Sequence, residues 1–289
     1  FHMIIENFHH KQSAHCESGV TLSLLNHYGI ELTEPLVFGI GAGLFFGHLP
    51  FVKVNGVPGT TFRIWPGYIF KRVCKELGIT IKTDSFSSPE KGMAALDAAL
   101  AANRPVGMQS SVYFLSYFPE AWRFHFNAHN LIAYGKEGNE YLISDPVMEN
   151  ITRIPDNELE KARFAKGFPA PNGKMYYPVL TAGSKDLSKA IISGMKKTCF
   201  FMLQSPPPFF GYRGIAFLDK RIKNYPQKLG ARKAGLFIGN IIRMQEEIGT
   251  GGAGFRFLYA AFLQEAAVIT KNDAFAKLPK GTIEGLLKD

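Results

Sequence analysis

The sequence is poor in cysteine and contains no long uninterrupted apolar run. Its 289 residues include three cysteines, Cys16, Cys74 and Cys199, which are too few and too far apart for a disulfide framework or a zinc cluster. An odd number of thiols is typical of a reducing compartment, where cysteines stay free. No stretch reaches the ~20 apolar residues of a membrane-spanning helix, and no secretory signal is recognisable. We therefore expect a cytoplasmic protein with no metal site and no membrane partner.

Motifs for binding nucleic acids and nucleotides are also lacking, although the net charge is +9. The basic residues are dispersed along the chain without a recognisable nucleic-acid motif. Their densest stretch, FLDKRIKNYPQKLGARKAG, favours solvated helix faces and could attract an acidic partner such as a phosphate-bearing carrier. The glycine-rich segment GTGGAGF lacks the Lys-Ser/Thr pair of a phosphate-binding P-loop. We expect neither a nucleic-acid partner nor a cofactor.

Local patterns in the first half of the chain indicate a mixture of helices and strands. Hydrophobic residues make up 46% and charged residues 20% of the sequence, as in soluble globular proteins. Apolar spacing and turn residues predict helices at 16–28, 66–78 and 88–103, strands at 79–86 and 104–112, a hairpin at 128–146, and a buried loop or strand pair at 37–51. Ser88 is the expected N-cap of its helix. This order predicts an α+β fold.

The second half of the chain is mainly helical by pattern. A charged helix at 155–167 precedes a linker-like stretch at 168–179. Further helical patterns lie near 184–203, 212–228, 230–248, 255–270 and 282–288. We therefore expect two domains, residues 1–155 and residues 156–289.

Cys16 lies at the expected start of the first helix, in SAHCESGVTL. If Ser13 caps this helix, Cys16 is its third residue, among backbone N–H groups that have no intrahelical partner. These groups and the helix dipole favour thiolate over thiol, and they could also stabilise the oxyanion formed from an acyl carbonyl. The alternative is that Cys16 is a small buried apolar residue, as we expect of Cys74 and Cys199.

A cysteine nucleophile needs a base, usually histidine, and often a third group that orients the base. Of the eight histidines, those near the start of the chain and those in apolar surroundings fit this role poorly, which leaves His125 and His129 in FHFNAHNLIAYG. The hairpin predicted at 128–146 places His129 at the start of one strand beside Asp145 at the end of the next. Asp145 could then orient His129 toward a thiol. The alternative is a structural Asp-Pro turn beside a histidine that has no chemical role.

Several segments together resemble the butirosin biosynthesis protein H N-terminal family. HCESG followed by GIELTEPLVFGIGAGLFF resembles the opening of that family, and FNAHNLIAYG followed by YLISDP resembles its second half. GTGGAGFRFLYAAFLQEAA, at 249–267, resembles the helical domain of unknown function that commonly follows. The family is similar to papain-like cysteine peptidases, including the bacteriocin-processing type. The resemblance therefore implies a papain-like cysteine-peptidase fold with a mainly helical C-terminal domain.

The resemblance also implies a chemistry. It makes Cys16 the nucleophile, His129 the base and Asp145 the orienting residue. The relative that names the family is an acyltransferase that moves an acyl group from a carrier-protein thioester to an amine of an aminoglycoside. By analogy, this chain would take an acyl group from an acyl carrier protein, or another acyl-thioester donor, and pass it to a small amine acceptor in secondary metabolite biosynthesis.

The oxyanion-stabilising residue departs from the papain-like pattern. Those peptidases place a glutamine several residues before the cysteine, whereas the upstream candidate here is Gln12, four residues before Cys16. This shorter spacing leaves Gln12, His15 and the backbone N–H of Cys16 as candidates. Two other functions stay open: a cysteine peptidase or amidase, in which water resolves the acyl-enzyme, and a non-catalytic binding protein on the same scaffold.

Overall fold

The computed structural model describes residues 2–54, 56–180, 186–247 and 249–278. The chain divides into two compact units, and each unit is made of two separate segments. The first comprises Phe1–Thr33 and Gly78–Ser184, and the second comprises Glu34–Leu77 and Lys185–Asp289. None of the helices in the described ranges combines the length and the apolar character needed to cross a bilayer.

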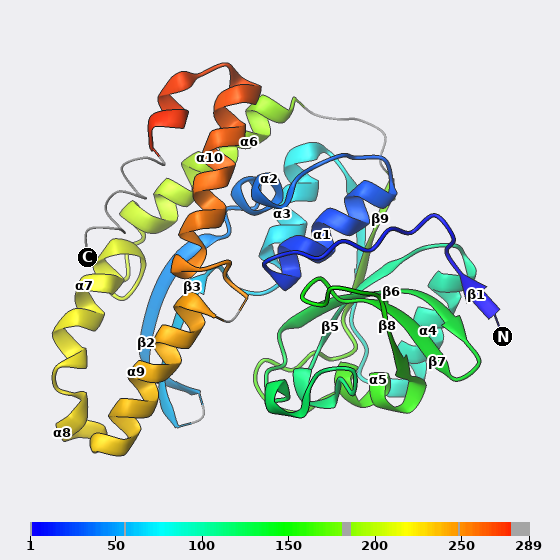
Figure 1. Cartoon of the computed structure of the whole chain (residues 1–289), viewed down its shortest axis with the longest axis horizontal. Coiled ribbons are helices and arrows are strands. Elements are labelled where there is room, and N and C mark those ends of the chain that lie inside the picture. Colours follow the sequence, from blue (N-terminus) through cyan, green and yellow to red (C-terminus); the bar gives the residue numbers. More distant parts are fainter. Residues whose placement is uncertain (1, 55, 181–185, 248, 279–289) are drawn as a thin grey trace. The chain divides into compact units, whose positions relative to one another are not determined.

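An antiparallel seven-stranded sheet forms the centre of the first unit (Figure 1). Its main path is β4-β9-β5-β6-β7-β8, and β1 pairs with the part of β6 that extends beyond β5. The strands are β1 (His2–Ile4), β4 (Thr80–Asp84), β5 (Val106–Ser110), β6 (His129–Glu137), β7 (Glu140–Ser144), β8 (Thr152–Pro155) and β9 (Met175–Leu180).

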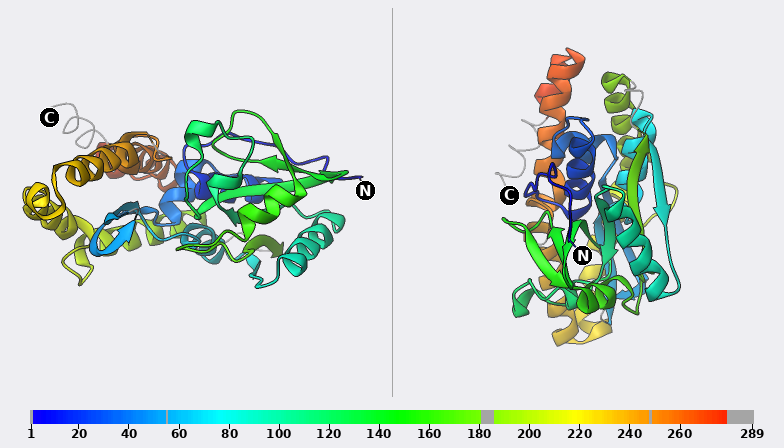
Figure 2. Two further views of the ribbon diagram at one scale, coloured as in Figure 1. Left: turned by 90° about the horizontal axis from the view of Figure 1, so that it is seen from below. Right: turned by 90° about the vertical axis from the view of Figure 1, so that its right-hand side faces the viewer.

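One buried helix packs against this sheet. The helices of the first unit are α1 (Cys16–His27), α4 (Pro89–Ala101) and α5 (Asp156–Arg163), with 3-10 turns η1 (Val112–Phe114) and η2 (Glu120–Trp122). In α1 every residue from Cys16 to Leu25 is buried, as expected of a helix at the centre of a core. It contacts β6 and β5 (Figure 2). The first turn of α1 is therefore held within the core of this unit.

The second unit combines helices with a two-stranded hairpin. Its elements are α2 (Glu34–Ile40), β2 (Leu44–Val54), β3 (Val57–Arg63), α3 (Tyr68–Leu77), α6 (Leu187–Cys199), the π-helical turn η3 (Phe200–Gln204), α7 (Gly211–Ile222), α8 (Tyr225–Leu229), α9 (Ala231–Glu246), the 3-10 turn η4 (Ala253–Phe255) and α10 (Arg256–Thr270). Helix α10 contacts α2 and α6, while α7 and α9 contact the hairpin (Figure 1).

The α+β class and most of the expected elements are confirmed. The β6–β7 hairpin has the predicted turn, with Glu137 opposite Glu140. Ser88 caps α4, because its hydroxyl accepts a hydrogen bond from the N–H of Lys91 at 3.3 Å. Between α6 and α10 the expected helices are present, and the pattern at 212–228 divides into α7 and α8. The helix expected at 282–288 lies outside the described residues.

Two segments differ from the sequence-based expectation. Residues 37–51, expected as a loop or strand pair, contain the end of α2 and much of β2. Residues 168–179, expected as a linker, contain most of β9, which pairs with β4 and β5 inside the sheet. Proline and glycine in FPAPNGKMYYPV are typical of loops, but pairing on both sides stabilises MYYPV as a strand.

The compact units are divided differently from the expected domains 1–155 and 156–289. Because β9 completes the sheet, the first unit extends beyond residue 155 to Ser184. Residues 34–77 belong to the second unit, because α2 packs against α10 and α6, and β2 packs against α7. This division depends on contacts between segments that are far apart in the chain. A change of composition along the sequence does not reveal such contacts.

Candidate functional site

Cys16 is the first residue of α1, and His15 caps that helix. The Nδ1 atom of His15 accepts a hydrogen bond from the backbone N–H of Ser18 at 3.3 Å. This corrects the expectation that Ser13 is the cap and Cys16 the third helical residue, because the backbone is still extended at His15, with φ −134° and ψ 133°. Cys16 still lies among the N–H groups of the first helical turn, which have no intrahelical acceptor.

The segment around the start of α1 is tied to the turn that follows β7. Ser13 donates its backbone N–H to the carbonyl of Pro146 at 2.7 Å, and Nδ1 of His10 lies 2.7 Å from the hydroxyl oxygen of Ser144. A Cβ at Gly19 would lie 2.5 Å from the Cβ of Pro146. Glycine therefore permits the close approach that brings the first turn of α1 to the end of β7.

His129 and Asp145 meet as the hairpin predicts. His129 begins β6, and Asp145 directly follows the last residue of β7. The Nε2 atom of His129 lies 2.6 Å from Oδ2 of Asp145. The two side chains are 6% and 0% exposed, so this contact is strengthened by its low-dielectric surroundings. The other ring nitrogen of His129, Nδ1, is left for the thiol.

Asp145 is surrounded by hydrogen-bond donors. The hydroxyl of Tyr117 donates to Oδ2 at 2.8 Å, and the backbone N–H of Val147 donates to Oδ1 at 3.1 Å. With His129, three donors use both carboxyl oxygens, which suits an ionised carboxylate that can only accept. The ring of Phe118 meets the imidazole of His129 edge-on, with centroids 5.6 Å apart. These contacts leave the imidazole little freedom to rotate.

The pKa values of the Cys16 thiol and the His129 imidazole are shifted in the directions that favour an ion pair. Burial by itself would raise the pKa of Cys16, but electrostatic interactions and hydrogen bonds with His15 and His129 outweigh it and lower that pKa well below its ordinary value. Burial by itself would lower the pKa of His129, but Asp145, through charge and hydrogen bond, and then Cys16 raise it to about 10. Thiolate and imidazolium are therefore favoured together, and the pair titrates as one system.

Asn130 also faces the thiol, which the sequence analysis did not identify. Its Nδ2 atom lies 3.9 Å from Sγ of Cys16, and its Oδ1 atom accepts a hydrogen bond from the hydroxyl of Tyr176 at 2.8 Å. Alternation along a strand predicts opposite faces for His129 and Asn130, so spacing offered no reason to combine them. The only local indication that Asn130 belongs to the site is its position directly after His129 in the AHN sequence, and this indication is weak.

Gln12 and His15, which the sequence suggested as donors to the oxyanion, lie in different surroundings. Gln12 is exposed and precedes the helix cap by three residues. His15 is buried, and its Nδ1 atom is engaged with Ser18. His15 also lies close enough to Cys16 to lower the pKa of the thiol. The structure therefore places His15 at the thiol and Gln12 at the surface.

Two other histidines, His48 and His125, make contacts away from the thiol. His48 is buried in the second unit, where its ring nitrogens lie 2.6 Å from the hydroxyl oxygen of Tyr225 and 3.0 Å from that of Thr60. Burial lowers the pKa of His48 to about 4, so the ring is neutral at physiological pH. His125, the first histidine of the FHFNAHN segment, is exposed and stacks on Tyr113 with centroids 4.1 Å apart.

An aromatic segment leads from His129 to the surface of the first unit. Phe118, which contacts the imidazole of His129, also lies 6.5 Å from Trp122 between ring centroids. Trp122 is 56% exposed, and Phe124 and Phe126 nearby are also exposed. Arg123 holds this loop by donating from its guanidinium to two backbone carbonyls. Such clustered exposed rings are typical of ligand or partner contacts.

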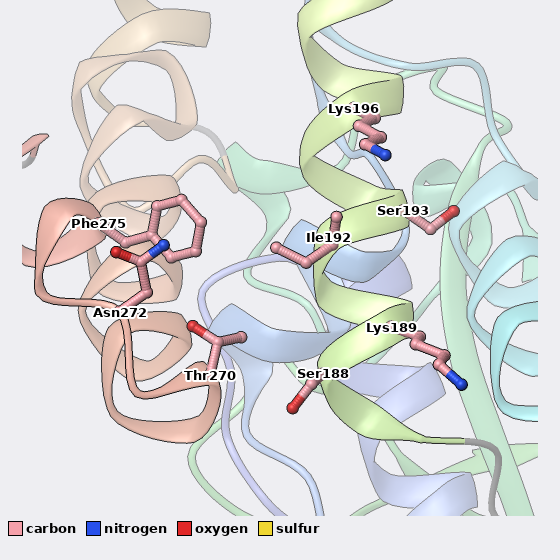
Figure 3. Close-up of a pocket in the computed structure, with 8 residues that line it drawn as sticks. All are labelled: Ser188, Lys189, Ile192, Ser193, Lys196, Thr270, Asn272 and Phe275. Atoms are coloured by element: carbon pink, nitrogen blue, oxygen red, sulfur yellow. The ribbon is translucent and has the colours of Figure 1, made fainter.

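The described ranges contain no cluster of metal-ligating side chains. No group of three His, Cys, Asp or Glu side chains there is arranged to hold a metal ion. A surface pocket of ≈ 610 Å³ lies in the second unit, between α6 and the segment that follows α10 (Figure 3). It is lined by Ser188, Lys189, Ile192, Ser193, Lys196, Thr270, Asn272 and Phe275. None of these is a candidate catalytic residue.

We expect iodoacetamide to label Cys16 at least about tenfold faster than Cys74 or Cys199 at about pH 6, where an ordinary thiol is protonated. The reason is the lowered pKa of Cys16, whereas burial raises the pKa of Cys74 to about 12. Cys199 is exposed and controls for access. Brief labelling followed by peptide mapping measures the three rates, and equal labelling would contradict the assignment of Cys16 as the reactive thiol.

Two family models match successive parts of the chain. Residues 15–146 match the family described as butirosin biosynthesis protein H, N-terminal, and residues 157–284 match a domain of unknown function, DUF4872. A crystal structure described as a C39-like peptidase from Bacillus anthracis is 17% identical, with a TM-score of 0.44, and the match covers 64% of this chain and 100% of that chain.

A second similar structure is the peptidase domain of Streptococcus ComA, described as a bifunctional ABC transporter involved in a quorum-sensing pathway. It is 12% identical, with a TM-score of 0.37, and the match covers 60% of this chain and 98% of that chain. No curated protein sequence matches the chain significantly.

Proposed function

Because residues 15–146 match the butirosin biosynthesis protein H N-terminal family, we propose that the chain is a cysteine-nucleophile acyltransferase. The observation that carries the proposal is the buried His129–Asp145 contact of 2.6 Å beside a thiol, Cys16, whose pKa is lowered. In the proposal Cys16 is the nucleophile, His129 exchanges protons, and Asp145 orients the imidazole. This combination is the one that acyl transfer through a covalent thioester requires.

In the first half-reaction, the thiolate of Cys16 attacks the carbonyl carbon of an acyl thioester. A bond forms between Sγ and that carbon, and the carbonyl oxygen becomes an oxyanion. When the oxyanion collapses, the carbon–sulfur bond to the donor breaks, and protonated His129 gives its proton to the departing thiolate. The products are an acyl-thioester on Cys16, a free donor thiol and a neutral imidazole.

In the second half-reaction, an amine attacks the carbonyl carbon of the acyl-enzyme. Neutral His129 accepts the proton that the attacking nitrogen loses, and the bond from that carbon to Sγ of Cys16 breaks. The products are an amide and the original thiolate–imidazolium pair. Asp145 orients the imidazole and stabilises the imidazolium each time it forms.

We propose an acyl carrier protein, or another acyl-thioester donor, as the donor and a small amine as the acceptor. The stretch at 217–235 carries six Lys and Arg residues and one Asp, which suits an acidic, phosphate-bearing carrier. Three free cysteines suit a reducing, cytoplasmic setting, and the description of the matching family suits secondary metabolite biosynthesis. The aromatic segment around Trp122 suits an organic acceptor and shields the acyl-enzyme from water.

We expect the protein, incubated with acyl-N-acetylcysteamine thioesters, to gain the mass of one acyl group on Cys16 and to release it as an amide when an amine is added. Intact-mass spectrometry measures the adduct, and chromatography measures amide against free acid. Free acid as the main product over a panel of amines would instead support a peptidase or amidase. Absence of any adduct with every donor would support a non-catalytic binding protein.

A further inference from the structure

Asn130 presents an amide to the sulfur of Cys16 inside the core of the first unit. Its side-chain Nδ2 atom lies 3.9 Å from Sγ, and the residue is 3% exposed. The same nitrogen donates to the backbone carbonyl of Ala128 at 3.2 Å. A primary amide has two N–H donors, so one is held by Ala128 while the other is directed toward the sulfur.

The orientation of this amide is set from both ends. Oδ1 accepts a hydrogen bond from the hydroxyl of Tyr176 at 2.8 Å, while Nδ2 donates to a carbonyl that can only accept. A flipped amide would place its oxygen against the Ala128 carbonyl oxygen, which is repulsive. The nitrogen therefore faces Cys16 in the stable orientation.

The tyrosine that orients the amide is itself fixed by the sheet. Tyr176 lies on β9 and is paired with Gly107 on β5. A Cβ at position 107 would lie 2.5 Å from the Tyr176 ring, so glycine makes the space that this ring occupies. Tyr176 is 3% exposed. Its hydroxyl thus reaches Asn130 from a ring that packing holds in place.

We propose that Asn130 donates the side-chain hydrogen bond to the oxyanion that forms when Cys16 is acylated, with Tyr176 as its positioning residue. This inference rests on the proposed acyl transfer at Cys16. The oxygen of an attacked carbonyl lies two bonds from Sγ. A donor at 3.9 Å from Sγ can therefore reach that oxygen at the about 2.7–3.1 Å that stabilisation of an oxyanion requires.

Two other side-chain amides of the first unit, those of Gln12 and Gln109, are less suited to this role. Gln12 is exposed, so water competes for its hydrogen bonds and its side chain is not preorganised. Gln109 is buried, and its Nε2 atom donates to the carbonyl of Asn127 at 2.8 Å, whereas the amide of Asn130 is the one that donates to the sulfur of Cys16. The backbone N–H of Cys16, in the first turn of α1, completes a pair of donors with Asn130.

A second role for Asn130 would be to stabilise the thiolate itself, and two reactions separate these roles. Acylation by 4-nitrophenyl acetate forms an Sγ–carbon bond at a carbonyl, passes through an oxyanion and releases 4-nitrophenolate. Alkylation by iodoacetamide forms an Sγ–carbon bond at a saturated carbon, releases iodide and forms no oxyanion. Both reactions depend equally on the fraction of thiolate.

The test compares Asn130→Ala and Tyr176→Phe with the unaltered protein in both reactions across pH. For Asn130→Ala we expect acylation to fall about 10²–10³-fold, while the alkylation rate and its midpoint pH change little. For Tyr176→Phe, which keeps the ring but removes the hydroxyl, we expect a loss of about tenfold in acylation alone, because the amide is free to rotate.

The outcomes distinguish this inference from the proposed function. Equal losses of acylation and alkylation in Asn130→Ala would assign Asn130 to the thiolate and overturn the inference, as would acylation that is unchanged in both variants. If Asn130→Ala does not fold, Tyr176→Phe decides by the same comparison, since it leaves Asn130 and the ring packing in place. An unaltered protein that alkylates rapidly but is never acylated would instead contradict the proposed acyl transfer.

Discussion

Cys16→Ala is expected to abolish formation of the acyl-enzyme completely, because no other atom can take the place of the Sγ nucleophile. The thiol is the group whose pKa His15 and His129 lower against the effect of burial. Alanine keeps the Cβ and removes one largely buried sulfur, so we expect the free energy of unfolding to change by about 1 kcal/mol. Intact-mass spectrometry with an acyl thioester measures the adduct, and thermal unfolding confirms the fold.

The matched controls are Cys74→Ala and Cys199→Ala. Cys74 is buried with its pKa raised to about 12, and Cys199 is exposed, so neither substitution should change the rate of acylation. An adduct that persists in Cys16→Ala would move the chemistry to another side chain. An adduct lost equally in Cys74→Ala would indicate an effect on folding rather than on the nucleophile.

Asp145→Asn is expected to lower the rate of acylation about 10²–10⁴-fold, the range for loss of a correctly positioned acid–base group. His129 and Tyr117 both donate to Oδ2, while Val147 donates to Oδ1. An amide offers an acceptor oxygen on one side and a donor nitrogen on the other, so it satisfies one side of this cluster and opposes the other. When the amide nitrogen faces His129, Nε2 of His129 must accept its hydrogen bond. The proton of the neutral imidazole then sits on Nδ1, which can no longer accept a proton from the thiol.

The same substitution should change the pH profile. Asp145 is the main group that raises the pKa of His129 to about 10, so its neutral replacement lowers that pKa. The imidazolium is then lost at lower pH, and the thiolate loses the charge that stabilises it. Because alkylation follows the fraction of thiolate, the pH at which the alkylation rate rises should therefore move to higher pH.

Tyr117→Phe is the matched control for Asp145→Asn. It removes one donor from Oδ2 of Asp145 and leaves the carboxylate and the His129 contact in place. We expect a much smaller loss of rate and a smaller change of pH profile than in Asp145→Asn. Equal rates in all three proteins would contradict the role of Asp145 as the orienting residue of His129.

Local elements of the fold were predictable where a strong local signal agreed with the tertiary contacts. Ser88 before Pro89 predicted the start of α4, and the polar turn between two apolar runs predicted the β6–β7 hairpin. The start of α1 was misplaced, because an imidazole nitrogen of His15 accepts the hydrogen bond expected of the Ser13 hydroxyl. Histidine is an uncommon cap, so residue preferences favoured the serine.

The strand β9 shows where local patterns fail. Its segment contains proline and follows a run of loop-forming residues, yet it is inserted between β4 and β5. Sheet neighbours with sequence separations of about a hundred residues, such as those of Ile81 and Pro178, have no local signature. The same strand supplies Tyr176, so the residue that orients Asn130 was hidden by the same error.

The amino-acid sequence by itself determined the α+β class, and it placed His129 beside Asp145, because hairpin pairing is a short-range consequence of turn and strand patterns. Only the tertiary structure decided that α1 carries the thiol to this pair and that Asn130 and Tyr176 join them. Those contacts depend on the packing of α1, β6 and β9, segments far apart in the chain, and on the space left by Gly19 and Gly107.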